Sequence, residues 1–252
     1  MAEAAVIEDT GFYFYGVVAA GTDVAGLQGL DDVEVMTVEH AGLAALVSVV
    51  RLQRPPGRAA ELVAHARVVD ALSAQATVVP AQFGLVLDHD LLEAARVLDD
   101  DTHALHDLLR RLDGKAQLNL RATYEPEQVL AELVRQDPQV AELRRRTARL
   151  APGTPHPELV ELGQAVSRGL TRKRLEDSQS VLDLVAPHVA EHVVRAGGEY
   201  DVLDVALLVE RDRIPRLEDE LEALAEAVHE RFRLRLVGPV APYDFVGSAP
   251  WA

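Results

Sequence analysis

The sequence predicts an α+β protein with two domains. The first region orders its elements as strand, hairpin, helix, short strand and helix, which is not the regular βα alternation of a doubly wound sheet. The second region reads as strand, long helices, strand, helix and strand, an order that resembles a ferredoxin-like half with an inserted helical hairpin. With 252 residues, 48% of them hydrophobic, the chain is long enough for two cores.

The first predicted domain spans residues 1–112 and is the smaller α+β domain. Residues 12–18 are rich in aromatic and β-branched types and carry apolar side chains on both faces, which predicts a central strand. The elements expected after it are a hairpin of strands 33–37 and 43–50, a helix through 62–72, a bent edge strand interrupted at Pro80, and a helix 89–112 that breaks at Asp99-Asp-Asp101.

The second predicted domain spans residues 113–252. It contains a helical hairpin over 126–195, broken by the proline-rich stretch 151–157, which is also a rival position for the domain boundary. The other elements expected are strand 116–124, helix 158–194 with a kink at Pro187, strand 200–210, a helix through 217–228, strand 232–237 and a C-terminal arm 238–252.

The arm begins where the last strand stops. Pro239 and Pro242 restrict the backbone, so Tyr243 and Phe245 are presented from a stiff, extended segment. Two roles are open for it: the arm closes the protein's own core, which is the commoner role for such a segment, or it binds a partner.

Composition excludes several classes of protein. Asp and Glu exceed Lys and Arg by 41 to 25, a net charge of −16, so phosphate repulsion argues against a nucleic-acid partner. The chain has no cysteine, which excludes disulfides and thiolate metal sites. We find no signal peptide and no apolar run that could span a bilayer, so we expect a cytoplasmic protein without a membrane partner.

The motifs of common enzyme sites are missing. The sequence has no Gly-x-Gly-x-x-Gly after a strand, no Walker A motif and no Gly-x-Ser-x-Gly. The pairs His103/His106 and His188/His192 have spacings that can bind a metal, but there is no His-Glu-x-x-His motif and no third His at helical spacing, and surface histidines are the commoner explanation. We therefore expect no enzyme, no cofactor and no metal.

The sequence contains one local cluster of basic residues, formed by Arg168, Arg172, Lys173 and Arg174. The favoured interpretation is a solvated helix face, and the alternative is a site for an anion or an acidic partner.

Three segments, in order, carry a resemblance to a known family. Val237-Gly-Pro-Val-Ala-Pro-Tyr-Asp-Phe-Val246 resembles the C-terminal signature of the gas vesicle proteins GvpL and GvpF, with Asp244 where that family usually has Ser. Phe12-Tyr-Phe-Tyr-Gly-Val-Val18 resembles the opening strand of the family. Val78-Val-Pro-Ala-Gln-Phe-Gly84 resembles its Val-Leu-Pro-x-Arg-Phe-Gly motif, with Gln82 in place of Arg.

The resemblance implies an accessory or minor structural protein needed to form gas vesicles, located in the cytoplasm and at the vesicle. Its expected partners are the small hydrophobic shell protein GvpA and other gas vesicle accessory proteins. The candidate partner contacts are Tyr243, Phe245, Trp251 and Phe83. Because residues 247–252 follow the last strand, we expect their deletion to leave the fold intact.

The alternative is a ferredoxin-like protein that binds a small molecule or catalyses a reaction. Such a function needs a concave pocket with convergent polar groups. The residues to inspect for that pocket are Gln82, Arg121, His65, Asp201 and Asp204.

Overall fold

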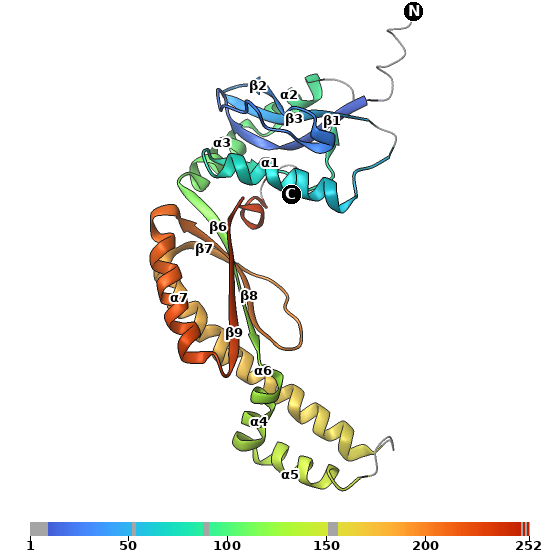
Figure 1. Ribbon diagram of the computed structural model, residues 1–252, viewed down its shortest axis with the longest axis vertical. Coiled ribbons are helices and arrows are strands. Elements are labelled where there is room, and N and C mark those ends of the chain that lie inside the picture. The colour runs from blue at the N-terminus through green and yellow to red at the C-terminus, as the bar shows by residue number, and fades with distance from the viewer. Residues whose placement is uncertain are drawn as a thin grey trace, which may run out of the picture. The chain divides into compact units, whose positions relative to one another are not determined.

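The computed structural model describes residues 10–51, 54–87, 91–150, 156–247, 249 and 251. They form two units (Figure 1): unit 1 combines the chain up to Gln117 with the segment from Gly238 onward, and unit 2 comprises Leu118–Val237. The division thus lies slightly later than the predicted 112/113. The arm 238–252, expected in the second domain, instead groups with unit 1, because its contacts are with residues early in the chain.

Unit 1 is built on an antiparallel sheet. Its strand order is β2-β3-β1-β4, and β5 also pairs with β1. Strand β1 therefore lies in the centre, as its two apolar faces predict, and β4 forms an edge that tolerates Pro80. The strands are β1 (Thr10–Ala19), β2 (Met36–His40), β3 (Leu43–Arg51), β4 (Val78–Pro80) and β5 (Val86–Leu87).

Strand β1 accommodates β4 through Gly16. The β1–β3 register shifts between Phe14 and Gly16, which marks a bulge, and Gly16 has φ of 147°. A Cβ at this position would lie 2.4 Å from the Val79 carbonyl oxygen. Only glycine fits this close approach of the two backbones.

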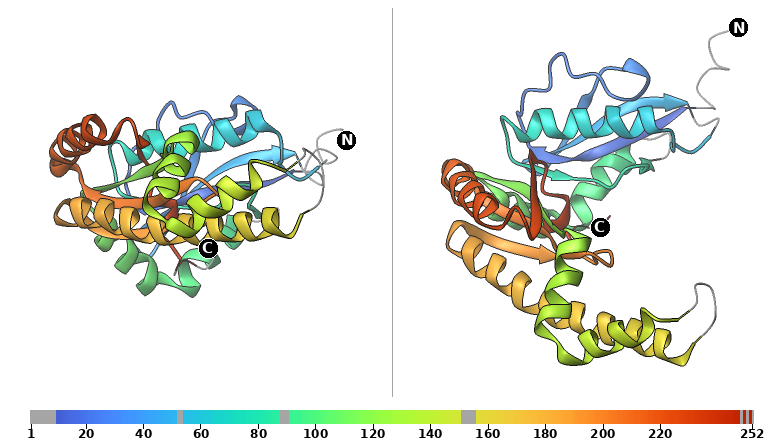
Figure 2. Two further views of the ribbon diagram at one scale, coloured as in Figure 1. Left: turned by 90° about the horizontal axis from the view of Figure 1, so that it is seen from below. Right: turned by 60° about the horizontal axis from the view of Figure 1, so that its bottom comes forward.

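Helices cover both faces of the unit 1 sheet. Helix α1 (Ala59–Ser73) lies on one face, and α2 (Leu91–Asp100) and α3 (Thr102–Leu112) lie on the other (Figure 2). The predicted break at Asp99-Asp-Asp101 is confirmed, since α2 ends at Asp100 and α3 begins at Thr102.

Unit 2 holds a four-stranded sheet whose order is β7-β8-β6-β9. Strands β6 and β9 begin or end in unit 1 and carry the chain between the units. The strands are β6 (Lys115–Tyr124), β7 (Val189–Val194), β8 (Asp201–Glu210) and β9 (Phe232–Val240), and the helices are α4 (Pro126–Gln136), α5 (Pro138–Thr147), α6 (Pro157–Val185) and α7 (Ile214–Val228).

Two sequence-based predictions were wrong in their bounds. The hairpin 126–195 is three helices and a strand: α6 ends at Val185, and 189–194, expected as helix, pairs with β8. Pro187 removes a helical hydrogen bond, and the valines after it favour a strand once β8 supplies a partner. The strand expected at 33–37 is β2 at Met36–His40, because the turn at Ala41-Gly42 sets its pairing with β3.

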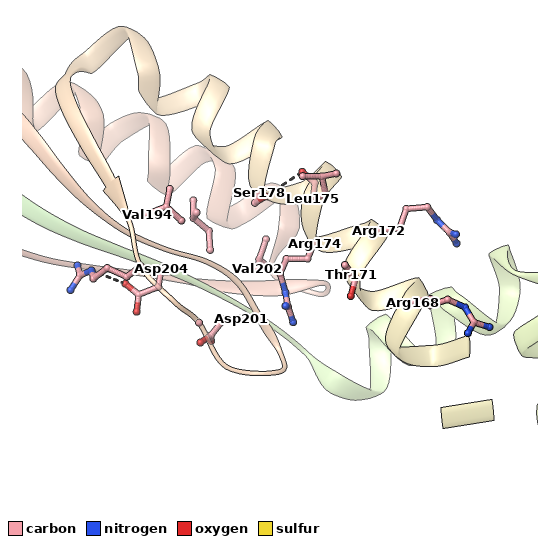
Figure 3. Close-up of a pocket in the computed structure, with 13 residues that line it drawn as sticks. Arg168, Thr171, Arg172, Arg174, Leu175, Ser178, Val194, Asp201, Val202 and Asp204 are labelled. Atoms are coloured by element: carbon pink, nitrogen blue, oxygen red, sulfur yellow. Dashed lines mark hydrogen bonds and ion pairs between the residues drawn. The ribbon is translucent and has the colours of Figure 1, made fainter. Parts of the chain in front are cut away.

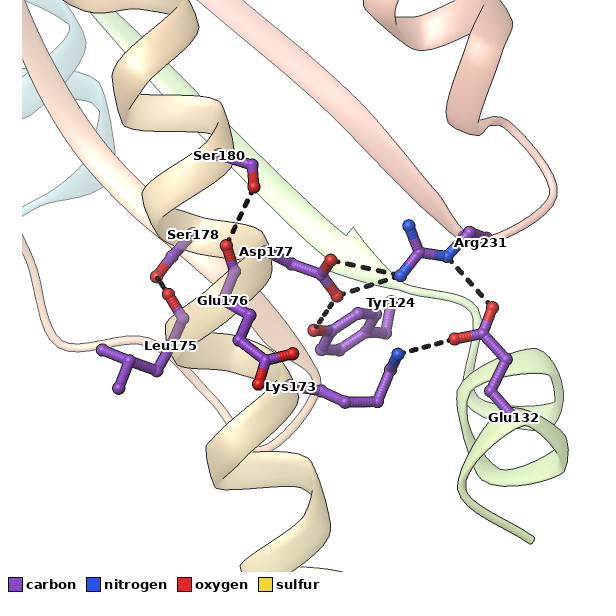
Figure 4. Close-up of polar contacts among 9 residues, drawn as sticks. All are labelled: Tyr124, Glu132, Lys173, Leu175, Glu176, Asp177, Ser178, Ser180 and Arg231. Atoms are coloured by element: carbon purple, nitrogen blue, oxygen red, sulfur yellow. Dashed lines mark hydrogen bonds and ion pairs between the residues drawn. The ribbon is translucent and has the colours of Figure 1, made fainter. Parts of the chain in front are cut away.

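A charged network joins the elements of unit 2 (Figure 4). The Tyr124 hydroxyl donates to Asp177 Oδ2 at 2.6 Å, and Arg231 donates to both Asp177 and Glu132 at 3.0–3.1 Å. The Lys173 ammonium, whose side chain is only 10% exposed, lies 2.7 Å from Glu132 Oε2. Burial alone would raise the pKa of Glu132, but hydrogen bonds from Lys173 and Arg231 outweigh it and lower this pKa.

We expect Lys173→Ala to lower the free energy of unfolding of unit 2 by about 2–4 kcal/mol, because it leaves the Glu132 carboxylate buried with one partner fewer. Arg145→Ala, which removes an exposed ion pair with Glu142 on α5, is the matched control and should cost less than about 1 kcal/mol. Urea unfolding followed by circular dichroism measures both. Equal losses in the two variants would contradict a structural role for the network.

Candidate partner-binding site

Two of the four predicted contact residues, Phe83 and Tyr243, lie in one aromatic cluster in unit 1. The His65 ring is central: its centroid lies 5.7 Å from Tyr15, 5.8 Å from Phe83 and 6.2 Å from Tyr243. Tyr13 packs edge-on against His65 at 5.6 Å. The four tyrosine and phenylalanine rings around His65 belong to a hydrophobic core cluster of unit 1, together with side chains from β3 and α1.

A hydrogen-bond chain fixes the orientation of His65. The Gly84 N–H donates to the Tyr13 hydroxyl at 3.0 Å, and this hydroxyl is hydrogen-bonded to His65 Nδ1 at 2.9 Å. His65 is 1% exposed, and this burial lowers its pKa to about 4. His65 is therefore a neutral core residue at pH 7 rather than a group that can exchange protons with a ligand.

The C-terminal arm is bound to unit 1 by its backbone. The Ala241 N–H donates to Asp70 Oδ1 at 3.0 Å. Gln117 and Asp244 bond each other twice, from Gln117 Nε2 to Asp244 Oδ2 at 2.6 Å and from the Asp244 N–H to Gln117 Oε1 at 3.0 Å. Arg111 donates to the carbonyl of Phe245, whose side chain is 3% exposed. These contacts favour the first of the two roles, an arm that closes its own core.

Trp251 extends these contacts beyond the last strand. Its ring packs edge-on against Phe14, with centroids 5.0 Å apart, and its Nε1–H donates to the Pro80 carbonyl at 3.0 Å. Ala249 is also buried. Residues 247–252 follow the last strand, as expected, but Trp251 contacts β1 and β4, so the effect of their deletion on the fold stays a prediction.

The predicted contact residues thus differ in exposure. Phe245 is buried, while Tyr243, Phe83 and Trp251 are half-buried. The Tyr243 hydroxyl is buried without a hydrogen-bond partner among the described residues. Contact between these four side chains and a partner stays a prediction.

Residues proposed for a small-molecule pocket are divided between the units. Gln82 is exposed and His65 lies in the core, both in unit 1, whereas the others belong to unit 2. There Arg121 donates to Asp201 Oδ2 at 2.8 Å, and Asp201 and Asp204 line a groove described below. The Arg121 hydrogen bond lowers the pKa of Asp201, as expected of a structural ion pair.

The candidate metal pairs have other contacts. His106 Nε2 lies 3.0 Å from the Ala41 carbonyl oxygen, and His188 Nε2 lies 2.8 Å from Glu220 Oε2. His188 and His192, expected at successive turns of one helix, lie respectively in a 3-10 turn and on β7. Across the described ranges, no three His, Asp or Glu side chains are grouped as metal ligands.

One surface of unit 2 has the character of a partner site. Helices α4, α5 and α6 line an open groove of about 390 Å³, here called the apolar groove. Its charged lining residues are Glu127 and Arg144, and the remainder is apolar: Leu130, Ala131, Val134, Val140, Leu162 and Val166. Leu159 and Val160, near the start of α6, are 42% and 62% exposed. Sequence periodicity marks these residues as apolar but does not reveal that three helices leave a space among them.

Comparison with known proteins decides the family. The family model described as "Gas vesicle synthesis protein GvpL/GvpF" matches residues 11–247. The chain belongs to this GvpL/GvpF family. Gas vesicle protein F from a Streptomyces species is 29% identical over 209 residues, which cover 82% of this chain and 85% of that protein. Gas vesicle protein F from Microcystis aeruginosa is 22% identical over 240 residues, covering 93% and 97%.

Solved structures of GvpF share the fold. The crystal structure of GvpF from Anabaena matches with a TM-score of 0.82 at 21% identity and covers 94% of this chain and 98% of that one. The structure from Microcystis aeruginosa gives a TM-score of 0.77, also at 21% identity and the same coverage. The mixed helix and strand content with two antiparallel sheets is therefore the GvpF fold. No helix in the described part of the chain is long and apolar enough to cross a membrane.

The three segments that resemble GvpL/GvpF motifs meet in unit 1. Residues 12–18 lie in β1, residues 78–84 include β4, which pairs with β1, and 237–246 include Ala241 and Tyr243 in the same core. The structure thus gives the family motifs a shared physical role in one core.

The buried His65 predicts a pH-dependent stability. Its pKa is 6.5 in the unfolded chain and about 4 in the fold, so between these values the unfolded state binds the extra proton. His65 therefore does not reduce the free energy of unfolding above about pH 6.5. As the pH falls from 6.5 toward 4, proton binding to His65 in the unfolded chain lowers this free energy by up to about 3 kcal/mol. We expect urea midpoints of the native protein to fall more steeply over this range than those of His65→Gln. Parallel profiles would contradict a neutral, buried His65.

Proposed function

We propose that this GvpL/GvpF protein is an accessory or minor structural protein needed for gas vesicle formation, and that it binds the hydrophobic shell protein GvpA and other gas vesicle proteins. The observation that carries the proposal is the family match over residues 11–247. We expect it to act in the cytoplasm and at the vesicle, without catalysis and without a cofactor.

The physical need for such a partner is clear. A small shell protein with a strongly apolar face associates with itself before it is assembled. A partner with an apolar groove can cover part of that face, and a net charge of −16 keeps the complex dispersed. The apolar groove of α4, α5 and α6 is the surface that we assign to this contact.

We also infer that unit 2 is ferredoxin-like. Its elements follow the order β6, helices α4–α6, β7, β8, α7 and β9, and the sheet order β7-β8-β6-β9 supports this assignment. On this assignment α4 and α5, together with the N-terminal part of α6, are an insertion between the first and second strands, and the apolar groove lies on that insertion.

Co-expression with GvpA tests the proposal. We expect the native protein to capture GvpA in a pull-down, and Ala131→Glu to reduce capture roughly tenfold because it places a charge in the apolar groove. Gln128→Glu, on the exposed side of the same helix, is the matched control and should capture normally. Failure of the native protein to capture GvpA would contradict the proposal. Equal capture by Ala131→Glu would contradict the assigned groove.

The predicted contacts of the arm are tested in the same assay. Tyr243→Ala combined with Phe245→Ala should lower the melting temperature strongly, since it opens the core of unit 1. Tyr243→Phe is the control, because it removes only a hydroxyl that has no partner. Lost capture by the double variant at a temperature where it remains folded would support partner contact by Tyr243 and Phe245. Unchanged capture under that condition would assign the arm to the core alone.

A further inference from the structure

A second groove in unit 2 has a different character from the apolar groove. It has a volume of about 550 Å³ and lies between α6 and the β7–β8 hairpin (Figure 3). Four arginines line it and give it the name arginine groove used below: Arg168, Arg172, Arg174 and Arg195.

The arginine groove reverses the charge of the molecule locally. Its two lining carboxylates are already bound, Asp201 by Arg121 at 2.8 Å and Asp204 by Arg195 at 3.3 Å. The lining therefore carries an excess of positive charge in a protein whose net charge is −16. An acidic ligand is attracted to a positively charged groove, whereas most of the surface of an acidic protein repels it.

The arginines are not equally available. Arg174 is held by the carbonyl groups of Gly198 and Glu199 and so fixes the loop after β7. Arg172 makes an ion pair with Asp137 at 3.3 Å but is 59% exposed, and exposed Arg168 has no ion pair with another described residue. Arg168 and Arg172, which project from α6 in Figure 3, are therefore the two that can bind a carboxylate from outside.

The arginine groove runs beside an open sheet edge. Strand β7 ends the order β7-β8-β6-β9, and within the described chain its other side has no strand partner. The Arg195 N–H bonds the Asp204 carbonyl at 2.8 Å, and because antiparallel bonds alternate, the Val194 N–H points away from β8. Unpaired backbone groups of this kind accept an added strand.

Apolar side chains accompany this edge. Val194 is 55% exposed, and Leu175, which faces the same groove from α6, is 72% exposed. A ligand that carries only negative charge would leave both uncovered. Because only every second side chain of an added strand faces the groove, a segment whose groove-facing positions include both acidic and apolar side chains satisfies both the arginines and these two residues.

We propose that the arginine groove binds an extended, acidic segment of another protein, which pairs with the outer edge of β7. Carboxylates of the segment bind Arg168 and Arg172, and its apolar side chains cover Leu175 and Val194. A second copy of this chain is the poorer occupant, because pairing β7 with β7 brings two arginine grooves of like charge together. This partner is distinct from the shell protein assigned to the apolar groove.

The probe is a fluorescein-labelled peptide of about eight residues in which every second residue is in turn Glu or Val and the residues between them are Thr. Fluorescence anisotropy with the full chain should show saturable binding that weakens as salt is added. The variant Arg168→Glu/Arg172→Glu should weaken binding at least roughly tenfold. Arg216→Glu/Arg235→Glu makes the same charge change at exposed positions of unit 2 outside the groove and should weaken it much less.

Strand pairing is tested separately from charge. Val194→Pro removes the outward N–H without removing a β7–β8 bond, so it should also reduce affinity roughly tenfold while circular dichroism stays unchanged. A peptide methylated at alternate backbone nitrogens should bind equally poorly to the native protein. Loss of binding in both cases supports strand addition, and unchanged binding in both overturns it.

Three further outcomes overturn the proposal. The first is equal binding of a peptide with Lys in place of Glu. The second is equal binding by the two double arginine variants. The third is a dimer, seen by sedimentation of the native protein and lost in Val194→Pro, which would show that the outer edge of β7 pairs with a second copy of the chain.

The proposal can fail independently of the proposed function. Capture of GvpA should be normal in Arg168→Glu/Arg172→Glu, so failure of peptide binding with intact capture of GvpA counts against the arginine groove alone.

Discussion

The closure of the unit 1 core by the far end of the chain is the constraint on which the rest of the structure depends. Ala241 bonds Asp70, and Tyr243 packs on His65, although the whole of unit 2 lies between these residues in the sequence. The chain must therefore leave unit 1 through β6 and return through β9. The entropic cost of closing such a loop grows only slowly with its length, so a folded unit can be inserted at modest cost.

The same constraint explains which parts of the fold the sequence predicts. Local signals were sufficient for the central strand β1, for the break between α2 and α3, and for the position of Pro80 on an edge. The sequence predicts a helix for the residues of β7 because their valines continue an apolar helical pattern, and only pairing with β8 makes them a strand. The place of 238–252 depends on contacts with residues such as Asp70 and Phe14, which no local pattern reveals.

For the candidate sites too, the sequence reveals the residues but not the surfaces that they form. Nearby prolines and the scarcity of aromatic residues make Tyr243 and Phe245 candidate contacts in the sequence, but how far each is buried follows from three-dimensional packing. The basic cluster on α6 is visible in the sequence, whereas the groove beside it is formed with residues 194–204, and no local pattern reveals that these lie against α6. In our account, unit 1 holds the motifs of the GvpL/GvpF family in one core. Unit 2 has one apolar and one arginine-lined groove, which we propose bind partners of different chemistry.

Native-state hydrogen exchange tests the central claim most directly. The amides of Ala241 and Asp244 bond Asp70 and Gln117, and the Phe14 amide in β1 bonds the Leu85 carbonyl. If the arm completes the core, all three amides open in one cooperative event and exchange with the same free energy of opening. Rapid exchange at Ala241 and Asp244, while Phe14 stays protected, would show that unit 1 folds without the arm and would contradict this account.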